Sequence, residues 1–288
     1  MNSMETTASY KSFLQSPYRS IKHASYFSVY DTLLNEYRGK NITFVEIGVL
    51  DGGSLFMWRD FFGENARIIG IEINKSAKVW EEHGFEIFIG SQSDPEFWKG
   101  LFNKVGNVDI VLDDGGHTYQ QQIVTVESSL QYIKPGGKII VEDTYTSYQK
   151  EYGSPSNYSF MKYAANLVDG MNLRTPKVKT TKKVNNIISN VTFFESIVSI
   201  GIQRDEGIEV AHGISNNGKI LGKPVESMRY ADTKAITILM GVIFAFKSLK
   251  NIPVLGNVVK SVGVSVSSFL KKLNNKIDNF KLRKYFRY

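Results

Sequence analysis

Cysteine is absent from this sequence of 288 residues. Its absence excludes a disulfide framework, a thiolate site for zinc or an iron–sulfur cluster, and a cysteine nucleophile. A chain without cysteine suits a reducing compartment, and we expect a cytoplasmic protein. The sequence is 42% hydrophobic and 12% aromatic, which is enough for a packed core and argues against a disordered chain.

Long hydrophobic runs are also missing. The longest apolar run covers 12 residues, 235–246, whereas a helix needs about 20 to cross a bilayer. Residues 1–10 contain no apolar stretch behind a basic start, so we do not expect a secretion signal. The sequence therefore predicts neither a transmembrane segment nor a leader peptide.

Acidic residues are almost absent from the C-terminal part of the chain. From Lys234 onward there are eleven Lys and Arg but one acid, Asp278, which gives a net charge of +10, and the preceding 233 residues have a net charge of −3. A near-neutral body does not indicate nucleic-acid binding. Basic residues beside the apolar run favour peripheral contact of residues 234–288 with the anionic inner face of the cell membrane. The alternative is a dimerisation helix with a soluble basic end.

Short apolar runs alternate with helical patterns along the first half of the chain. The expected strands are residues 41–48, 66–73, 85–89, 108–112 and 138–141, and the expected helices between them are residues 54–62, 76–83, 95–105 and 119–133. The remaining expected elements are helices around 26–37 and 158–170 and a last strand over 191–202, with 208–212 as a possible partner. This alternation is typical of a doubly wound, mostly parallel α/β sheet.

A glycine-rich turn follows the first expected strand and opens a helix. Gly48, Gly52 and Gly53 have the spacing G-x-x-x-G-G, which differs from the G-x-G-x-x-G of dinucleotide-binding folds. Glu72 ends the second expected strand, where a carboxylate can accept both hydroxyls of a ribose. Because such sheets bind ligands at the carboxyl ends of their strands, this pair favours a ribose-bearing ligand without a diphosphate, S-adenosylmethionine ahead of NAD. A purely structural turn is the alternative.

Two acidic clusters follow the fourth and fifth expected strands. Asp113 and Asp114 stand shortly before His117, and Glu142 and Asp143 come after the fifth strand. Crowded carboxylates raise one another's pKa unless a cation relieves the repulsion, and oxygen ligands suit Mg²⁺, Mn²⁺ or Ca²⁺. His117 is placed to take a proton from a hydroxyl near neutral pH. The alternatives are acids that cap helices and a histidine with a structural role.

A resemblance to a known family lies in the segments VEIGVLDGGS, GIEI, VLDDGGH and IIVEDT and in Lys22-His23-x-x-Tyr26 before the core. Over residues 18–203 the chain resembles the class I S-adenosylmethionine-dependent methyltransferases. Within that class it is similar to the metal-dependent sugar O-methyltransferases of the macrocin and mycinamicin type and to the related cephalosporin-hydroxylase-like group. The resemblance implies a seven-stranded, Rossmann-like sheet with an N-terminal helix and a basic C-terminal helical tail.

The resemblance also implies roles for particular residues. His117 would be the catalytic base. The metal, Mg²⁺ or Mn²⁺, would be held by Asp114, Glu142 and Asp143. The positions implied for S-adenosyl-L-methionine are Glu46, Gly48, Gly52, Glu72, Ser91, Asp94 and Asp113. The residues expected to contact the substrate are Lys22, His23, Tyr26 and Tyr145.

The expected function is methyl transfer from S-adenosylmethionine to a sugar hydroxyl, in bacterial surface-glycan or secondary-metabolite biosynthesis. The acceptor would be a glycan or a glycosylated small molecule, and a homo-oligomer is one possible state. A catechol-like acceptor and a non-catalytic cofactor-binding subunit that docks to glycosyltransferases are the alternatives. The expected segments are an N-terminal helical cap (1–40), a cofactor-binding catalytic domain (41–212), a connecting segment (213–233) and an apolar and basic helical tail (234–288).

Overall fold

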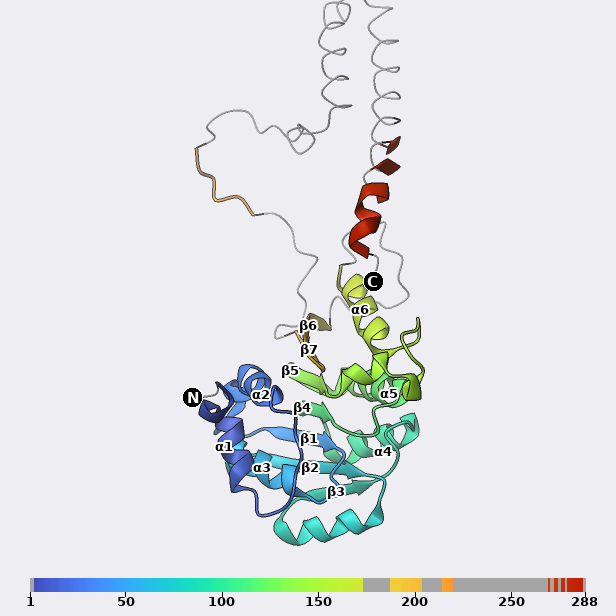
Figure 1. Cartoon of the computed structure of the whole chain (residues 1–288). Helices are drawn as coiled ribbons and strands as arrows, with labels where there is room; N and C mark the ends of the chain where they lie inside the picture. The colour runs from blue at the N-terminus through green and yellow to red at the C-terminus, as the bar shows by residue number, and fades with distance from the viewer. Residues whose placement is uncertain are drawn as a thin grey trace, which may run out of the picture. The chain divides into compact units, whose positions relative to one another are not determined.

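The computed structural model (Figure 1) describes residues 3–172, 187–203 and 214–219 and parts of 269–286. The chain divides into two compact units, Met1–His212 and Gly213–Tyr288, and each is described by itself. The finer division into four segments stays a prediction.

A seven-stranded sheet forms the centre of the first unit, in the order β3-β2-β1-β4-β5-β7-β6. Its strands are β1 (Thr43–Ile47), β2 (Arg67–Glu72), β3 (Glu86–Ile89), β4 (Val108–Asp113), β5 (Ile133–Val141), β6 (Ile188–Phe194) and β7 (Ile197–Ile202). Strands β1 to β5 pair in parallel, whereas β7 runs antiparallel to both β5 and β6. The prediction of a doubly wound, mostly parallel, seven-stranded sheet is confirmed.

Helices cover both faces of this sheet (Figure 1). One face carries α1 (Ala8–Gln15), α2 (Tyr26–Leu34) and α3 (Gly53–Phe62), and the other carries α4 (Pro95–Val105), α5 (Tyr119–Ser129) and α6 (Phe160–Met171). The 3-10 helices are η1 (Ser3–Thr6), η2 (Asn35–Tyr37), η3 (Lys75–His83), η4 (Leu130–Tyr132), η5 (Thr144–Tyr148), η6 (Lys150–Tyr152) and η9 (Arg283–Phe286).

Alternation along β1 builds a hydrophobic core on each face of the sheet. Phe44 packs against Trp58 of α3 with ring centroids 5.1 Å apart, whereas Val45 belongs to the core on the opposite face. Because side chains two apart on a strand share a face, Glu46 lies on the α3 side with Phe44. The strand therefore carries a carboxylate into a buried layer.

The last strands of the sheet differ from the expectation. Residues 191–202, expected as one strand, form a hairpin in which β6 ends at Phe194 and β7 begins at Ile197. Ser196 has a left-handed backbone (φ 62°) in the turn. Apolar residues continue on both sides of this turn, so hydrophobicity did not separate the two strands. The partner strand expected at 208–212 lies outside the described residues.

Two other expected elements also differ in detail. Residues 76–83 lie in the 3-10 helix η3 rather than in an α-helix. The helix expected over 119–133 ends at Ser129, and the strand expected at 138–141 already begins at Ile133. Residues 134–137, which contain Pro-Gly-Gly, were expected in neither the helix nor the strand, but the chain stays in the sheet there through a register irregularity opposite β4.

The described residues of the second unit between 269 and 286 are helical. Their apolar side chains are exposed, among them Phe269, Leu273, Ile277 and Phe280. Within the described residues no helix combines the length and hydrophobicity that a membrane span requires.

The packing around α4 predicts that Trp98→Ala strongly destabilises the fold. Trp98 is fully buried, stacks on Phe102 and donates its indole N–H to the carbonyl of Gln92 at 2.9 Å. We expect the substitution to lower the free energy of unfolding by about 3–5 kcal/mol in urea titrations, because it leaves a cavity. Leu14→Ala, at a side chain that is 60% exposed, is the control and should cost less than about 0.5 kcal/mol. Equal costs would contradict this description of the core.

Candidate active site

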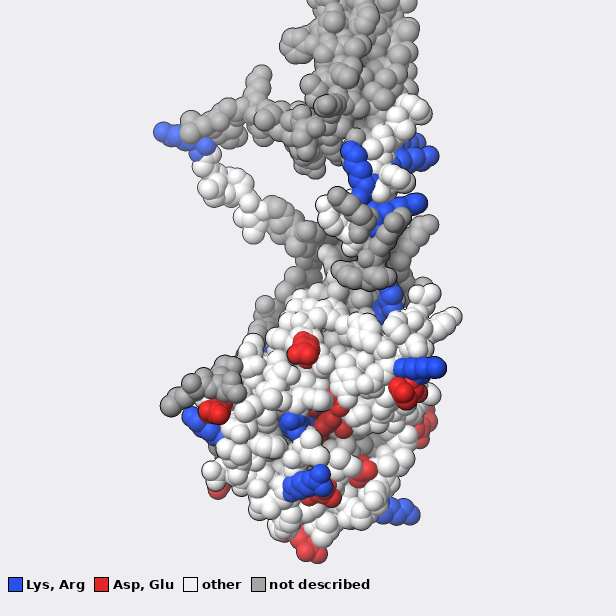
Figure 2. Space-filling model, viewed as in Figure 1, with Lys and Arg blue, Asp and Glu red and all other residues white. Residues whose placement is uncertain are grey.

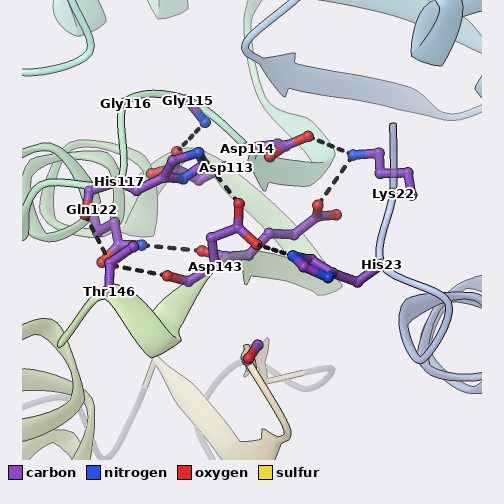
Figure 3. A network of polar contacts seen from close by, with 12 residues as sticks. Lys22, His23, Asp113, Asp114, Gly115, Gly116, His117, Gln122, Asp143 and Thr146 are labelled. Atoms are coloured by element: carbon purple, nitrogen blue, oxygen red, sulfur yellow. Dashed lines mark hydrogen bonds and ion pairs between the residues drawn. The ribbon is translucent and has the colours of Figure 1, made fainter. Parts of the chain in front are cut away.

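Three parts of the first unit meet at the carboxyl ends of β1, β4 and β5 (Figure 3). Asp113 ends β4 and is followed by Asp114, while Glu142 and Asp143 follow β5. The segment between α1 and α2 brings Lys22 to the same place. Parallel strands end at one edge of the sheet, which is why acids distant in sequence lie together there.

Asp114, His117 and Asp143 form a group that could hold a metal ion, since one ligand atom of each lies within 4.8 Å of the others. Nε2 of His117 is 3.3 Å from Oδ2 of Asp143. Nδ1 of His117 is buried and has no hydrogen-bond partner in the part of the chain that the structure describes. Two carboxylates and an imidazole are donors that Mg²⁺ or Mn²⁺ accepts, so the residues present fit a divalent cation.

The backbone is left-handed at both His117 (φ 59°) and Asp143 (φ 53°). This conformation costs a residue other than glycine about 1–2 kcal/mol. Oγ1 of Thr146 lies 3.1 Å from the carbonyl oxygen of His117 and 2.9 Å from that of Asp143, so one hydroxyl links the two turns. Strained turns that aim side chains into one site are typical of functional positions.

Glu142 is buried, with 1% of its side chain exposed. The hydroxyl of Tyr30 donates to its Oε1 at 2.6 Å, and the ammonium of Lys22 donates to its Oε2 at 3.1 Å. The side-chain amide of Gln122 donates to its backbone carbonyl at 3.0 Å. Burial raises the pKa of Glu142 to about 8, although Lys22 opposes the shift. Both carboxylate oxygens are thus engaged by residues from the N-terminal part of the chain.

Lys22 lies among these acids with only 2% of its side chain exposed. Its ammonium is 2.6 Å from Oδ2 of Asp114 and 3.9 Å from Oε1 of Glu46. Burial alone would lower the pKa of Lys22, but the nearby charges, with Asp114 the strongest, raise it well above its ordinary value. The surrounding acids therefore favour the charged form of Lys22.

Glu46 on β1 is fully buried and receives two donors from α3. The hydroxyl of Ser54 and the indole N–H of Trp58 lie 2.8 Å and 3.0 Å from its carboxylate oxygens. Burial raises the pKa of Glu46 to about 7, while Lys22 and the two donors oppose the shift. Ser54 and Trp58 are four residues apart, so one helix face presents both donors.

The glycine turn after β1 is packed closely against its surroundings. Gly48 and Gly52 have left-handed backbones, with φ of 91° and 76°. A Cβ on Gly48 would lie 2.1 Å from the carbonyl oxygen of Asp114, and one on Gly52 would lie 2.3 Å from the ring of Trp80. Neither position has room for a side chain.

Glu72 holds this turn to the end of β2. Its Oε2 accepts the backbone N–H groups of Val49 and Leu50 at 3.0 Å and 3.2 Å. Its Oε1 accepts those of Ile73 and Asn74 at 2.8 Å and 3.0 Å. The carboxylate therefore shapes the turn, and the expected contact with a ribose stays a prediction.

Asp113 is buried beneath the loop that follows β3. Its carboxylate accepts the side-chain amide of Gln92 at 2.9 Å and 3.1 Å and the backbone N–H of Gly115 at 3.1 Å. Burial raises the pKa of Asp113. Oε1 of Gln92 also accepts the backbone N–H of Gly116 at 2.8 Å. Gln92 thus joins the ends of β3 and β4.

Ser91 and Asp94 lie in the loop between β3 and α4. Asp94 caps α4, because its carboxylate accepts the backbone N–H of Glu96 at 3.0 Å. Oγ of Ser91 lies 3.3 Å from the backbone nitrogen of Ser93. Both side chains have local partners, and their role beside an adenine ring stays a prediction.

Three of the four residues expected to contact the substrate, His23, Tyr26 and Tyr145, lie around Asp143, whereas Lys22 pairs with Asp114 and Glu142. The hydroxyl of Tyr26 donates to Oδ1 of Asp143 at 2.5 Å. Nε2 of His23 lies 3.8 Å from the same oxygen, and the His23 side chain is 58% exposed. The rings of His23 and Tyr145 are 5.9 Å apart. The structure brings these residues together, while contact with a substrate stays a prediction.

Sequence reasoning missed four residues of this network: Tyr30, Gln92, Gln122 and Thr146. One of them had a signal, because Tyr30 follows Tyr26 by one helical turn, and the two hydroxyls reach the adjacent acids Glu142 and Asp143. Gln92 stands in a loop without a recognisable pattern.

Comparison with known proteins identifies the middle of the chain. Residues 45–144 match the family model of a methyltransferase domain. This part of the chain is a methyltransferase domain. The segment contains the turn after β1, Glu72, and both acidic clusters.

The methyltransferase domain is similar to several curated O-methyltransferases. Demethylmacrocin O-methyltransferase of Streptomyces fradiae is 32% identical over 135 residues, which are 44% of this chain and 34% of the relative. Mycinamicin VI 2''-O-methyltransferase of Micromonospora griseorubida is 31% identical over 135 residues, 44% of this chain and 33% of the relative. The chain thus spans about a third of the length of these curated relatives.

A solved structure with the same fold is the MycE methyltransferase from the mycinamycin biosynthetic pathway in complex with Mg and SAH. It superposes with a TM-score of 0.58 at 25% identity and covers 73% of this chain and 56% of that chain. The predicted Rossmann-like methyltransferase fold and the resemblance to the macrocin and mycinamicin type are confirmed.

The burial of Glu46 predicts a pH dependence of stability. Its pKa is about 7 in the folded chain, against an ordinary value of 4.5. Between these values the folded state keeps a proton that the unfolded state has released, so the free energy of unfolding falls as pH rises. The fall is up to about 3 kcal/mol. We expect Glu46→Gln to lose the part of this fall that comes from Glu46. Urea titrations at several pH values between 4.5 and 7, with EDTA, measure it.

Glu96→Gln is the matched control for this experiment, because the side chain of Glu96 is 82% exposed. It should leave the dependence of stability on pH unchanged. The interpretation of Glu46 is wrong if wild type and Glu46→Gln lose stability equally over this range.

Proposed function

We propose that this protein is an S-adenosylmethionine-dependent, divalent-metal-dependent O-methyltransferase that acts on a sugar hydroxyl. The observation that carries the proposal is the group of Asp114, His117 and Asp143 at the carboxyl edge of a methyltransferase domain. The relatives are named as O-methyltransferases of demethylmacrocin, of mycinamicin VI and of a rhamnosyl tetracenomycin. We place the reaction in bacterial surface-glycan or secondary-metabolite biosynthesis, with a glycan or glycosylated small molecule as acceptor.

Asp114, Glu142 and Asp143 are the proposed metal ligands, and their carboxylates suit Mg²⁺ or Mn²⁺. A bound divalent cation would lower the pKa of a hydroxyl in a vicinal diol. Asp114 and Asp143 already face the same space as His117, whereas Glu142 is held by Lys22. The MycE complex contains Mg, which supports a divalent metal as a cofactor for this fold.

His117 is the proposed general base. Its side chain is 21% exposed, so a hydroxyl can approach it, and the Asp143 carboxylate lies 3.3 Å from Nε2. The negative charge of Asp143 would stabilise the imidazolium that forms when His117 takes the hydroxyl proton. The left-handed backbone at both residues keeps the pair oriented.

The cofactor positions follow the carboxyl ends of β1 to β4, where open α/β sheets bind ligands. They are Glu46, Gly48, Gly52, Glu72, Ser91, Asp94 and Asp113. S-adenosylmethionine would supply an electrophilic methyl group. The closely packed turn at Gly48 and Gly52 brings backbone rather than side chain to the edge of the site. The MycE complex contains SAH, which supports a related cofactor for this fold.

The first test is calorimetric titration of S-adenosylhomocysteine into the purified protein, with Mg²⁺ and again with EDTA. We expect binding in both conditions, with a heat that the metal changes. Absence of binding in either condition would contradict the cofactor assignment.

The second test measures methyl transfer from labelled S-adenosylmethionine to glycosides that carry vicinal hydroxyls. We expect His117→Ala to lower the rate 10²–10⁴-fold because the base is lost, while S-adenosylhomocysteine still binds. His83→Ala is the matched control, since this exposed histidine lies on η3, and its rate should stay that of wild type. If methyl groups were transferred to catechols but not to glycosides, the acceptor would be a catechol and not a sugar. If His117→Ala and His83→Ala transferred methyl groups at equal rates, His117 would be excluded as the base.

The C-terminal segment 234–288 is proposed to make peripheral contact with an anionic membrane surface. Phe269, Leu273, Ile277 and Phe280 are exposed and recur at helical spacing. Lys272, Lys276, Lys281 and Arg283 lie between and beside them. An exposed apolar stripe bordered by basic residues suits anionic headgroups. Figure 2 shows acidic and basic residues interspersed over the visible face of the first unit. The charges counted along the sequence place the basic excess in residues 234–288.

Vesicle flotation tests this contact. We expect the protein to bind phosphatidylglycerol vesicles more tightly than neutral phosphatidylcholine vesicles. Replacing Lys272 and Lys276 by Ala should cost about 2 kcal/mol, or about 30-fold in affinity. The pair Lys150→Ala and Lys162→Ala in the first unit is the control. Equal binding to both lipids, or self-association without lipid binding, would favour a dimerisation helix.

A further inference from the structure

The acids Glu46, Asp114 and Glu142, called the acidic site below, already have a positive charge from the chain beside them, the ammonium of Lys22. The ammonium of Lys22 lies 2.6 Å from Asp114, 3.1 Å from Glu142 and 3.9 Å from Glu46. Its side chain is 2% exposed, so water cannot screen these charges. In Figure 3 the Lys22 side chain reaches Asp114 from the side away from His117.

Lys22 and a metal ion bound by both Asp114 and Glu142 would need the same space. The proposed ligands Asp114 and Glu142 both direct an oxygen to the ammonium at hydrogen-bond distance. A Mg²⁺ or Mn²⁺ ion bound by these two carboxylates would sit about 2.1 Å from an oxygen of each. The ammonium and such an ion cannot both occupy the gap between Asp114 and Glu142.

The segment that carries Lys22 is attached at both ends but irregular in the middle. At one end the hydroxyl of Ser16 donates to the carbonyl of Gly53 at 2.8 Å, and at the other α2 begins at Tyr26. Residues 19–23 belong to no helix or strand. A short irregular segment can turn Lys22 outward without unfolding either helix.

We propose that Lys22 is a resident counter-cation that holds Asp114 and Glu142 in the metal-free protein and is displaced when a divalent cation binds. Removing the positive charge from buried carboxylates is costly, so the ammonium stabilises the site until a metal replaces it. This role differs from the substrate contact that the resemblance implies for Lys22. The inference rests on the proposed metal site but not on methyl transfer.

Manganese titration followed by electron paramagnetic resonance tests the competition. We expect Lys22→Met, which keeps the length of the side chain but not its charge, to bind Mn²⁺ at least tenfold more tightly than wild type. Lys22→Arg should bind no more tightly than wild type, because it keeps the charge. Lys134→Met is the matched control: Lys134 pairs with Asp109 at 2.8 Å, outside the acidic site, and its loss should not change Mn²⁺ affinity.

Chemical modification of wild type tests the displacement itself and needs no variant that folds. Lysines are acetylated with an amine-reactive ester, and the rate at Lys22 is read by mass spectrometry with and without Mg²⁺. We expect the metal to speed acetylation of Lys22 at least tenfold, with Lys134 as the unchanged internal reference.

The outcomes separate this inference from the proposed function. Unchanged or weaker Mn²⁺ binding by Lys22→Met would overturn the inference, and so would tighter binding with no change in acetylation, because the metal would then bind beside Lys22. Either result leaves the titration of S-adenosylhomocysteine and the methyl-transfer assay to be judged on their own results.

Discussion

A carboxylate inside a protein needs donors in place of the water it has lost. Glu142 obtains them from the N-terminal part of the chain, where Tyr30 and Lys22 each donate to one of its oxygens. These contacts attach α2 and the segment before it to the end of β5. The other site residues take their places around this attachment, because Lys22 also fixes Asp114 and the neighbouring Tyr26 reaches Asp143.

The site therefore depends on a balance of charge. Several buried or half-buried acids share one lysine, and burial raises the pKa of both Glu46 and Glu142. A divalent cation would meet the remaining negative charge, which is why a metal-dependent reaction suits this edge of the sheet better than a site built for neutral groups. The backbone is left-handed at both His117 and Asp143, and it directs the imidazole and the carboxylate toward each other.

The part of the chain that matches the methyltransferase family model runs from β1 to the residues that follow β5. The methyltransferase domain covers residues 45–144, whereas Tyr30 and Lys22 precede the match. The match spans about a third of the length of the curated relatives.

The order of strands and helices, the doubly wound sheet and the meeting of the two acidic clusters could be predicted from the sequence alone, because periodic hydrophobicity and the parallel arrangement fix where strands end. The hairpin inside 191–202 could not, since apolar residues continue on both sides of its turn. Nor could the partners of each acid. Only the tertiary structure decided that Lys22 lies between Asp114 and Glu142 and that Gln92 holds Asp113. Those contacts join residues from different loops, and loop residues carry no periodic signal that would pair them in advance.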